Sequence, residues 1–422
     1  MASSYQHNYY DYIVVGCGGV GSAALFRLAR NSRGNESVLG IEQFHLGHDN
    51  GGSQDHSRII RLSYAGSDFI ALADGAYKAW AEVEDESGIQ LVQRTGGLDI
   101  AEKNTQGEAR LKACAETMDA AGIKYEFLHG IQLHQKFPSF SPKANTVALY
   151  QKDGGLVDAA LSNAVHIQLA RKYGADVLEN TVVRNISRAP DGKLCVSTSN
   201  GTFRCKKVVV TAGAWLNKVL KSVGVHIPVT VTQEQVTYFG TPHMKEFTYK
   251  RTLRFPYFIN HTARVYAIPI YGNSGFKIGM DAAGPSVTPD TRTFVPDEKR
   301  VKYCVDVLKD LLPRSLGPIL YTKTCLYTMT SDRIFVVDTA YRTGFPDVAI
   351  CCGAGHVYKF AAVMGKILSQ ITLDQRVSYN LNEFTLDRPA ITDPNFKKNF
   401  VFVDNIISKT KNSSAVGAKA KL

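Results

Sequence analysis

The chain has 422 residues, of which 44% are hydrophobic and 21% charged, with a formal net charge of +11. This length exceeds what one hydrophobic core usually holds, so we expect two domains of a soluble globular protein. No stretch reaches the roughly 20 apolar residues that span a bilayer, and the lysines and arginines are scattered without a nucleic-acid-binding motif. These features argue against membrane and nucleic-acid partners.

The eight cysteines show neither the spacing of a disulfide framework nor a C-x-x-C pair. Residues 1–10 lack the apolar segment of a secretory signal. We therefore expect reduced thiols and no metal site.

The first predicted elements form a βαβ unit. A short apolar strand over residues 12–15 precedes Gly16, Gly18 and Gly21, which have G-x-G-x-x-G spacing, and residues 20–30 are predicted to be helical. Glycines here permit a tight turn and a close approach of the backbone to a pyrophosphate, which the helix amino terminus attracts. The pattern predicts a dinucleotide site.

A second strand, over residues 37–41, ends at Glu42, roughly 20 residues after Gly21. An acid there can accept hydrogen bonds from both ribose hydroxyls and disfavours a 2′-phosphate. The first sixty residues alone do not distinguish a nicotinamide cofactor that dissociates from a flavin that stays bound.

The remaining elements alternate between two kinds of region. We expect helices near residues 69–84, 111–121 and 361–370, a strand over 94–101, a turn at 137–138, a helix and strand within 153–186, a hairpin over 201–215, and strands over 335–338 and 348–351. From about residue 219 to 324, β-branched and aromatic residues alternate with turns, as in a mostly antiparallel sheet.

This order predicts an α/β protein with a parallel, Rossmann-like dinucleotide domain and an interleaved α+β substrate domain that contains the mostly antiparallel sheet. The predicted segments are 1–90, 152–218 and 325–390 for the dinucleotide domain, 91–151 and 219–324 for the substrate domain, and 391–422 for a carboxy-terminal extension.

The last residues, KTKNSSAVGAKAKL, are small, polar and basic, as in a mobile tail. They end in Ala420, Lys421 and Leu422, which resembles the carboxy-terminal address of the S-K-L type that the peroxisomal import receptor reads. The tail predicts a peroxisomal location.

Five further motifs lie in order along the chain: GGSQDHSRIIRLSY (51–64), VVVTAGAW (208–215), YAIPIYGNSGFKIGM (266–280), TCLYTMTSD (324–332) and GAGHVYKFAAVMGKIL (353–368). Together they resemble the monomeric sarcosine oxidase and pipecolate oxidase family, flavoproteins of the glutathione-reductase-like fold, over about residues 10–390. The resemblance implies that the dinucleotide is FAD.

The same resemblance implies catalytic and substrate-binding roles. Arg58 would lie against the flavin, His356 would lie beside the ring, and Lys277 would be the ammonium that activates oxygen. The substrate-binding set would be Arg61 and Lys359 on the substrate carboxylate, with Tyr266, Tyr327 and Asp281 in the pocket.

It also implies how FAD is held. Cys325 would be joined covalently to the flavin 8α carbon. The predicted cofactor-binding residues are Gly16, Gly18, Gly19, Gly21, Glu42, Ser57, Arg58, Gly213, Cys325, Gly353, Gly355 and Lys359.

Four positions depart from the family pattern. Gln54 replaces a histidine, Asp55 stands at a usual glycine, and Val357 replaces another glycine. Asp281 replaces a histidine of the sarcosine pocket, which favours a substrate with positive charge or hydrogen-bond donors beyond the amine, unless the acid neutralises Lys277 or turns outward.

The predicted function is a monomeric flavin-dependent oxidase of secondary α-amino acids, such as sarcosine, other N-alkyl amino acids or L-pipecolate. It would yield an imine and reduce O2 to H2O2. Three alternatives are an FAD-dependent dehydrogenase or demethylase with a non-oxygen acceptor, a binding protein that has lost the chemistry, and an NAD-dependent dehydrogenase.

Overall fold

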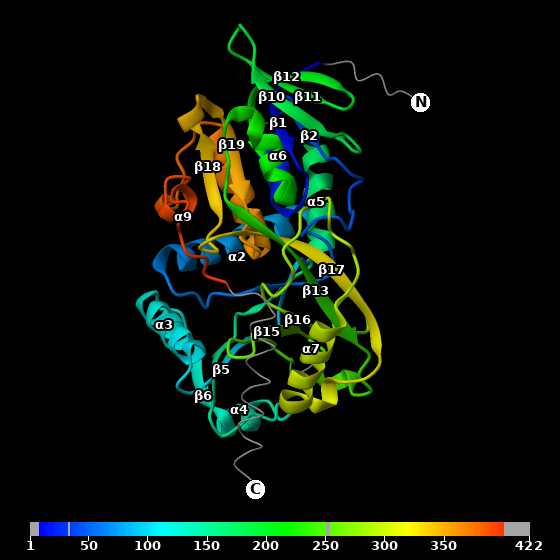
Figure 1. The fold of residues 1–422 in the computed structure, drawn as a ribbon, viewed down its shortest axis with the longest axis vertical. Coiled ribbons are helices and arrows are strands. Elements are labelled where there is room, and N and C mark those ends of the chain that lie inside the picture. The colour runs from blue at the N-terminus through cyan, green and yellow to red at the C-terminus, as the bar shows by residue number, and fades with distance from the viewer. Residues whose placement is uncertain (1–7, 33, 250–253, 401–422) are drawn as a thin grey trace.

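The computed structural model describes residues 8–32, 34–249 and 254–400. Its upper half in Figure 1 is built on an eight-stranded sheet. The strands run in the order β10 (Val183–Arg188), β11 (Leu194–Thr198), β12 (Gly201–Val210), β1 (Tyr9–Val15), β2 (Val38–Ile41) and β9 (Asp176–Leu178), with β19 (Phe345–Cys352) and β18 (Val336–Ala340) branching from β12.

The centre of this sheet is parallel, and its register fixes the site. Val15 pairs with Ile41 on one side and with Val210 on the other, and Val210 pairs with Ile350. The carboxyl ends of β1, β2, β12 and β19 therefore lie in one row, which is where open α/β sheets bind ligands.

Both faces of the parallel strands are buried, as their near-continuous apolar sequences predict. Val14 and Val209 face a core shared with α1, α2, α5 and α8, whereas Val15 and Val210 face a second core that includes α6. The helices are α1 (Gly19–Ser32), α2 (Ser67–Ser87), α5 (Ala159–Lys172), α6 (Leu216–Leu220) and α8 (Ala361–Thr372), and α9 (Pro389–Thr392) follows near the end of the described chain.

The lower half in Figure 1 holds a second eight-stranded sheet. Its order is β17 (Ile319–Thr330), β13 (Val229–Phe239), β16 (Phe276–Met280), β15 (Val265–Ile268), β14 (Tyr257–Asn260), β5 (Gly97–Glu102), β7 (Thr146–Gln151) and β6 (Glu126–His129). The pairings are antiparallel except between β14 and β5. The flanking helices are α3 (Gln106–Ala120), α4 (Gly130–Lys136) and α7 (Glu298–Leu311).

A small sheet of β3 (Arg58–Ile60), β8 (Gly155–Val157) and β4 (Val92–Arg94) completes the fold. The long strands β13 and β17 extend from the lower half toward the first sheet (Figure 1). The predicted fold class, a parallel dinucleotide sheet combined with a mostly antiparallel one, is confirmed.

Two predicted elements were wrong in detail. The hairpin expected over residues 201–215 is a single strand, β12, followed by a short helical turn, and its antiparallel partner β11 precedes it. The strand expected over residues 94–101 is two strands, β4 and β5, separated at Thr95 and Gly96. Gly96 has φ +78°, which turns the chain from the small sheet into the second large sheet. The break therefore changes the sheet partner of the strand.

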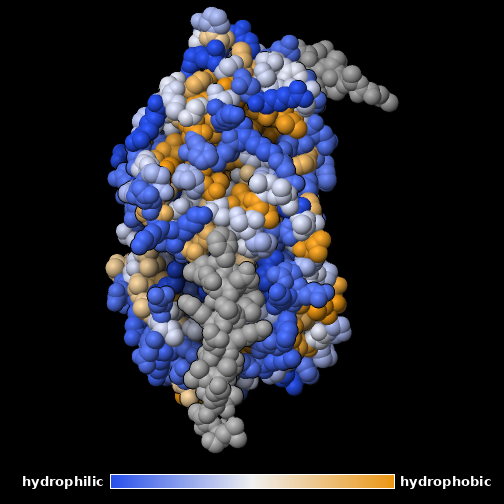
Figure 2. All heavy atoms as spheres, viewed as in Figure 1, coloured by the Kyte–Doolittle hydropathy of each residue, from blue (hydrophilic) through white to orange (hydrophobic). Residues whose placement is uncertain are grey.

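The face in Figure 2 is mostly hydrophilic, and its hydrophobic residues form separate patches. Within the described residues, no helix has the length and apolar character needed to cross a membrane.

Candidate active site

A cavity of about 1250 Å³ is lined by residues of both large sheets. One end is lined by the glycine turn after β1, by Glu42 after β2 and by residues 211–215 after β12. The other end is lined by Tyr266, Tyr327, Asp281 and Lys359. The cavity therefore reaches from the carboxyl edge of the parallel sheet to residues of the second sheet.

The turn after β1 requires glycine at two positions. Gly16 has φ +89°, and a Cβ on Gly21 would lie 1.8 Å from the Gly16 carbonyl oxygen. Thr211 Oγ1 donates to that same carbonyl oxygen at 2.7 Å. The turn therefore brings α1, β1 and β12 together at the cavity, which suits the pyrophosphate of a dinucleotide.

Glu42 lies beside this turn and is buried. Its carboxylate accepts hydrogen bonds from the backbone N–H groups of Cys17 at 2.9 Å and Phe44 at 3.1 Å. His48 Nε2 also lies 3.4 Å from Glu42 Oε1. A carboxylate has about four acceptor positions, so these contacts still leave acceptor capacity for ribose hydroxyls. The glycine turn and Glu42 thus fit an adenosine diphosphate moiety.

The loop of residues 49–58 runs along the cavity and is bound to β17. Gln54 Nε2 donates to the Thr324 carbonyl oxygen at 2.7 Å, and Arg292 donates to the Asn50 carbonyl at 2.7 Å and to Thr324 Oγ1 at 2.8 Å. Arg58 donates to the carbonyl oxygens of Gln54 and Ser57, and its guanidinium lies 5.7 Å from the centre of the Tyr358 ring.

Cys325 follows Thr324 on β17. Its neighbours Lys323, Leu326, Tyr327 and Thr328 on β17 line the cavity, although Cys325 itself is not part of the lining. Burial raises the pKa of the Cys325 thiol to about 11, against the opposing effect of Arg58, Lys277 and Arg292. The thiol is free and partly buried.

Lys277 on β16 is 2% exposed and lies near the same loop. Its Nζ donates to Asp55 Oδ2 at 2.6 Å and to the Ser57 carbonyl oxygen at 3.0 Å. Burial lowers the pKa of Lys277, while Asp55 acts in the opposite direction. One open alternative for Asp281 is that it neutralises Lys277. This alternative does not apply, because Asp55 forms the ion pair with Lys277.

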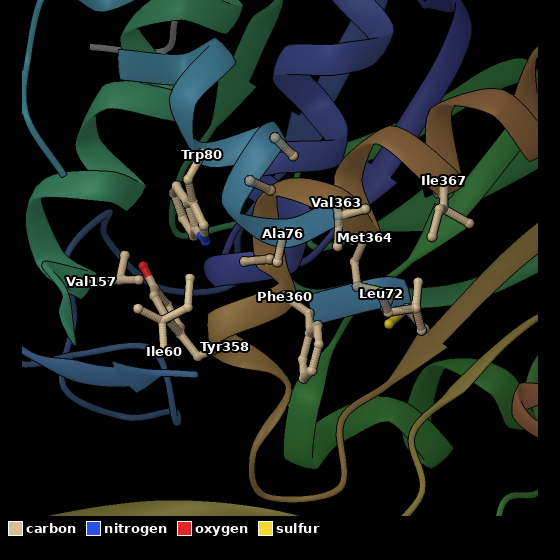
Figure 3. Close-up of a cluster of buried hydrophobic side chains, with 14 of the residues drawn as sticks. Ile60, Leu72, Ala76, Trp80, Val157, Tyr358, Phe360, Val363, Met364 and Ile367 are labelled. Carbon is tan, nitrogen blue, oxygen red and sulfur yellow. The ribbon is translucent and has the colours of Figure 1, made fainter. Parts of the chain in front are cut away.

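Lys359 lines the other end of the cavity from the turn before α8. Figure 3 shows the supporting core, in which Trp80 and Tyr358 pack near Ile60 and Val157. Trp80 Nε1 donates to the Lys359 carbonyl oxygen at 2.8 Å, and Tyr358 Oη donates to the Ala159 carbonyl oxygen at 2.6 Å. These bonds fix the backbone from which the Lys359 side chain extends.

The Lys359 Nζ donates to the His356 carbonyl oxygen at 2.9 Å. Within the described chain, no carboxylate lies within ion-pair distance of it. Burial, followed by the nearby Arg61, lowers the pKa of Lys359 to about 7. The amine therefore has no acidic partner in the described chain, and its protonated form is available to an anionic ligand.

Arg61 lines the cavity but already has an acidic partner. Its Nη1 donates to Asp99 Oδ1 at 2.6 Å, and the same carboxylate accepts from Ser63 Oγ at 2.6 Å and contacts His261 Nε2 at 2.7 Å. Burial alone would raise the pKa of Asp99, but Arg61 and His261 hold it below its usual range. Asp99 thus fixes the Arg61 side chain against β5.

Asp281 forms a two-point ion pair with Arg333, with distances of 2.8 and 3.1 Å. The Asp281 side chain is 42% exposed, within the cavity wall. His356 contacts the Arg333 carbonyl oxygen through Nε2 at 2.8 Å. Burial lowers the pKa of His356 well below its usual value, so the ring is neutral and Nε2 is the donor.

The structure thus places most residues predicted for the site around one cavity; Gly21 and Cys325 are not part of its lining, and the tripeptide Ala420–Leu422 lies outside the described residues. Their roles stay predictions. Gly213 and Gly355 both have positive φ. Val357, at a usual glycine position, begins a short helical turn and does not have a positive φ.

The sequence reasoning missed the partners of the charged residues. These are Asp99, His261, Tyr238, Arg292 and Arg333. An acid within the apolar strand segment LDIA was a signal for a buried partner at Asp99. Among the described residues, no cluster of histidine, cysteine, aspartate and glutamate is arranged to hold a metal ion.

Comparison with known proteins adds independent findings. Residues 11–371 match a protein family described as FAD dependent oxidoreductase. Monomeric sarcosine oxidase of Arthrobacter sp. (strain TE1826) is 31% identical over 394 residues, which cover 90% of this chain and 97% of the relative. Peroxisomal sarcosine oxidase of Mus musculus is 30% identical across 91% of this chain and 97% of its own.

Solved structures share the fold. NikD, an unusual amino acid oxidase essential for nikkomycin biosynthesis, superposes with a TM-score of 0.78 over 93% of this chain and 98% of its own, at 22% identity. L-proline dehydrogenase from P. horikoshii has a TM-score of 0.75 over 90% of this chain and 97% of its own, at 20% identity.

Proposed function

Because this chain belongs to the family of FAD-dependent oxidoreductases and has sarcosine oxidases as homologues, we propose that it oxidises secondary α-amino acids with dioxygen as electron acceptor. The family membership confirms the predicted cofactor class, an FAD enzyme acting on CH–NH donors. The substrate class, hydrogen peroxide as product and the covalent tether are the proposed refinements.

A single observation supports this choice of substrate most strongly. Lys359 is a cation in the cavity without a carboxylate partner in the described chain, and Arg61 lies near enough to lower its pKa. A substrate carboxylate provides the missing anion. Each charged hydrogen bond would contribute roughly 1.5–3 kcal/mol.

The residues present fit FAD along the cavity. The turn at Gly16, Gly18 and Gly21 would hold the pyrophosphate, and Glu42 the adenosine ribose. Cys325, which lies on β17 among residues that line the cavity, would provide the tether. When bound, FAD would accept the hydride from the carbon beside the substrate nitrogen.

The chain's own residues would prepare the substrate. Lys359 and Arg61 would bind its carboxylate, and Tyr266 and Tyr327 would bound the space around its amine. Nearby cations and burial both lower the pKa of a bound ammonium group. Each unit by which that pKa falls corresponds to about 1.4 kcal/mol. The cations and burial would thus yield the neutral amine without a separate base.

The balance of the reaction defines the proposed product. Oxidation of the CH–NH unit to an imine releases two electrons and two protons, which convert one O2 to one H2O2. Lys277, which contacts the loop of residues 49–58, would stabilise negative charge that develops on oxygen. A peroxisomal location is consistent with peroxide formation.

A second candidate is a dehydrogenase with another acceptor. The observation that favours it is Asp55, whose carboxylate lies 2.6 Å from Lys277 Nζ and can offset the positive charge. The two functions differ in how much peroxide forms per substrate oxidised.

The test uses the purified full chain and a panel of N-methyl, cyclic and primary amino acids. We expect secondary amino acids to bleach the flavin absorbance without oxygen and to yield one H2O2 per O2 consumed in air. Bleaching without peroxide would support the dehydrogenase, and no bleaching by any amino acid would overturn both functions.

The tether has its own test. Cys325→Ser is expected to release flavin into the supernatant after acid precipitation, whereas Cys351→Ser, a buried cysteine on β19, should keep it in the pellet. Flavin retained in both pellets would point to another attachment residue.

A further inference from the structure

The environment of Lys277 contains an acid that the sarcosine oxidase resemblance does not account for. Asp55 stands at a usual glycine position and keeps the left-handed backbone, with φ +82°. Its side chain is nearly buried, at 7% exposure. Asp55 therefore keeps an uncommon backbone conformation at the position where its side chain contacts a buried lysine.

Three groups orient the Asp55 carboxylate. Lys277 Nζ donates at 2.6 Å, Tyr238 Oη lies 2.7 Å from both carboxylate oxygens, and Arg58 Nη1 lies 3.9 Å away. The Asp55 carbonyl oxygen also accepts from the Ala160 backbone N–H at 3.0 Å. The loop is therefore held so that the carboxylate faces Lys277.

A buried lysine tends to lose its proton, because burial disfavours the charged form. The charged and titratable groups that face Lys277 are Asp55 and Arg58 from the loop and β3, Tyr238 from β13 and Cys325 from β17. Burial and Arg58 lower the pKa of Lys277, and Asp55 is the principal group that raises it.

We propose that Asp55 is a positioning residue that keeps the buried Lys277 as an ammonium ion and fixes it beside Ser57. This inference rests on the proposed oxygen-serving role of Lys277. In this view Asp55 supports the reaction with oxygen, because a neutral amine at Lys277 could not stabilise developing negative charge.

The experiment compares Asp55→Asn with wild type, with Lys277→Met and with the double variant. Asp55→Gly is a second route, because glycine favours the backbone at φ +82°. Tyr238→Phe is the matched control, since it removes one hydrogen bond to Asp55 but keeps both charges.

The first readout is the rate at which O2 reoxidises the reduced flavin between pH 6 and 9. We expect the rate in Asp55→Asn and Asp55→Gly to fall with rising pH, with a midpoint at lower pH than in wild type and Tyr238→Phe. The double variant should be slow at every pH. Faster reoxidation in Asp55→Asn at every pH, or an unchanged midpoint, would overturn the proposal.

The second readout needs no turnover: the urea midpoint of each purified full chain over the same pH range. In Asp55→Asn, the pKa of Lys277 lies further below its unfolded value, so the unfolded chain binds more protons and stability rises with pH. The midpoint difference between Asp55→Asn and the double variant should therefore increase with pH. A constant difference would contradict the proposal.

The two readouts separate two kinds of failure. If Lys277→Met reoxidises like wild type, the oxygen-serving role fails, while the urea series still decides whether Asp55 holds the charge on Lys277. If Lys277→Met is slow but Asp55→Asn has the wild-type profile in both readouts, only the Asp55 inference fails.

Discussion

The cavity contains two lysines in opposite electrostatic situations. Lys277 Nζ lies 2.6 Å from the Asp55 carboxylate and is 2% exposed, so its charge is balanced within the protein. Lys359 Nζ donates to a backbone carbonyl, and the described chain gives it no acidic partner. A protein carboxylate thus balances the charge of Lys277, whereas the charge of Lys359 has no such partner until an anionic ligand binds.

The arginines around Lys359 differ from it, because each of them has an acidic partner. Arg61 is bound to Asp99 and Arg333 to Asp281, so both are oriented before any ligand arrives. A fixed cation beside a free one suits a carboxylate, because the fixed group provides direction and the free one provides the uncompensated charge. The predictions below test this division, beginning with the largest expected effect.

Replacing Lys277 by methionine should slow reoxidation of the reduced flavin by O2 about 100-fold or more, the usual effect of removing one preorganised electrostatic group. Stopped-flow mixing of reduced protein with oxygenated buffer measures it. Lys323→Met is the matched control, because Lys323 lines the same cavity but is 3.9 Å from Asp49 and partly exposed. Equal rates in the two variants would remove the distinction that we draw for Lys277.

Replacing Lys359 by methionine should weaken substrate binding about 10- to 100-fold, since one charged hydrogen bond of roughly 1.5–3 kcal/mol is lost. Anaerobic titration of the flavin reduction rate against substrate concentration gives the affinity. Lys359→Arg retains a positive charge and should recover much of the loss. An affinity in Lys359→Met that matches wild type would place the substrate carboxylate elsewhere.

The pKa of Lys359, about 7 in the ligand-free site, leads to a pH effect. A bound carboxylate raises that pKa, so binding is strongest below pH 7 and weakens by up to about tenfold per pH unit above it. An ether acid, with oxygen in place of the amine, avoids titration of the ligand nitrogen. Its affinity, followed by the flavin spectrum, should be independent of pH in Lys359→Arg. A flat wild-type profile would contradict the free-cation assignment.

The smallest effect is expected at Asp281. Asp281→Asn leaves Arg333 without its acidic partner, so amino acids with a second carboxylate should improve relative to neutral ones by about two- to fivefold, because the pair is partly exposed. The ratio of the two rates at low substrate concentration measures it. No change in this ratio would mean that the Asp281–Arg333 pair lies away from the bound side chain.

The part of the site that the sequence predicted is the part fixed by local backbone. The glycine turn, the strand before it and the acid at the end of the second strand follow from short-range rules, and the structure has them in that order. The strand expected over residues 94–101 failed because Gly96 sends the chain into another sheet, a change that depends on distant pairing partners.

The ion pairs that define the cavity were beyond sequence reasoning. Asp55 and Lys277 are 222 residues apart, Asp281 and Arg333 are 52 apart, and Arg61 and Asp99 are 38 apart. Nothing in the local pattern of either partner identifies the other, since the sheets bring them together. The resemblance to sarcosine oxidases indicated Arg61, Lys277 and Lys359, but not which of them carries a free charge.

The most direct test compares the two half-reactions in Lys277→Met and Lys359→Met under identical conditions, with flavin reduction measured without oxygen and flavin reoxidation measured without substrate. We predict a crossed pattern, in which Lys277→Met chiefly slows reoxidation and Lys359→Met chiefly weakens the substrate dependence of reduction. If each variant impairs both half-reactions to the same degree, the division of the cavity into a carboxylate-binding end and an oxygen-serving end is wrong.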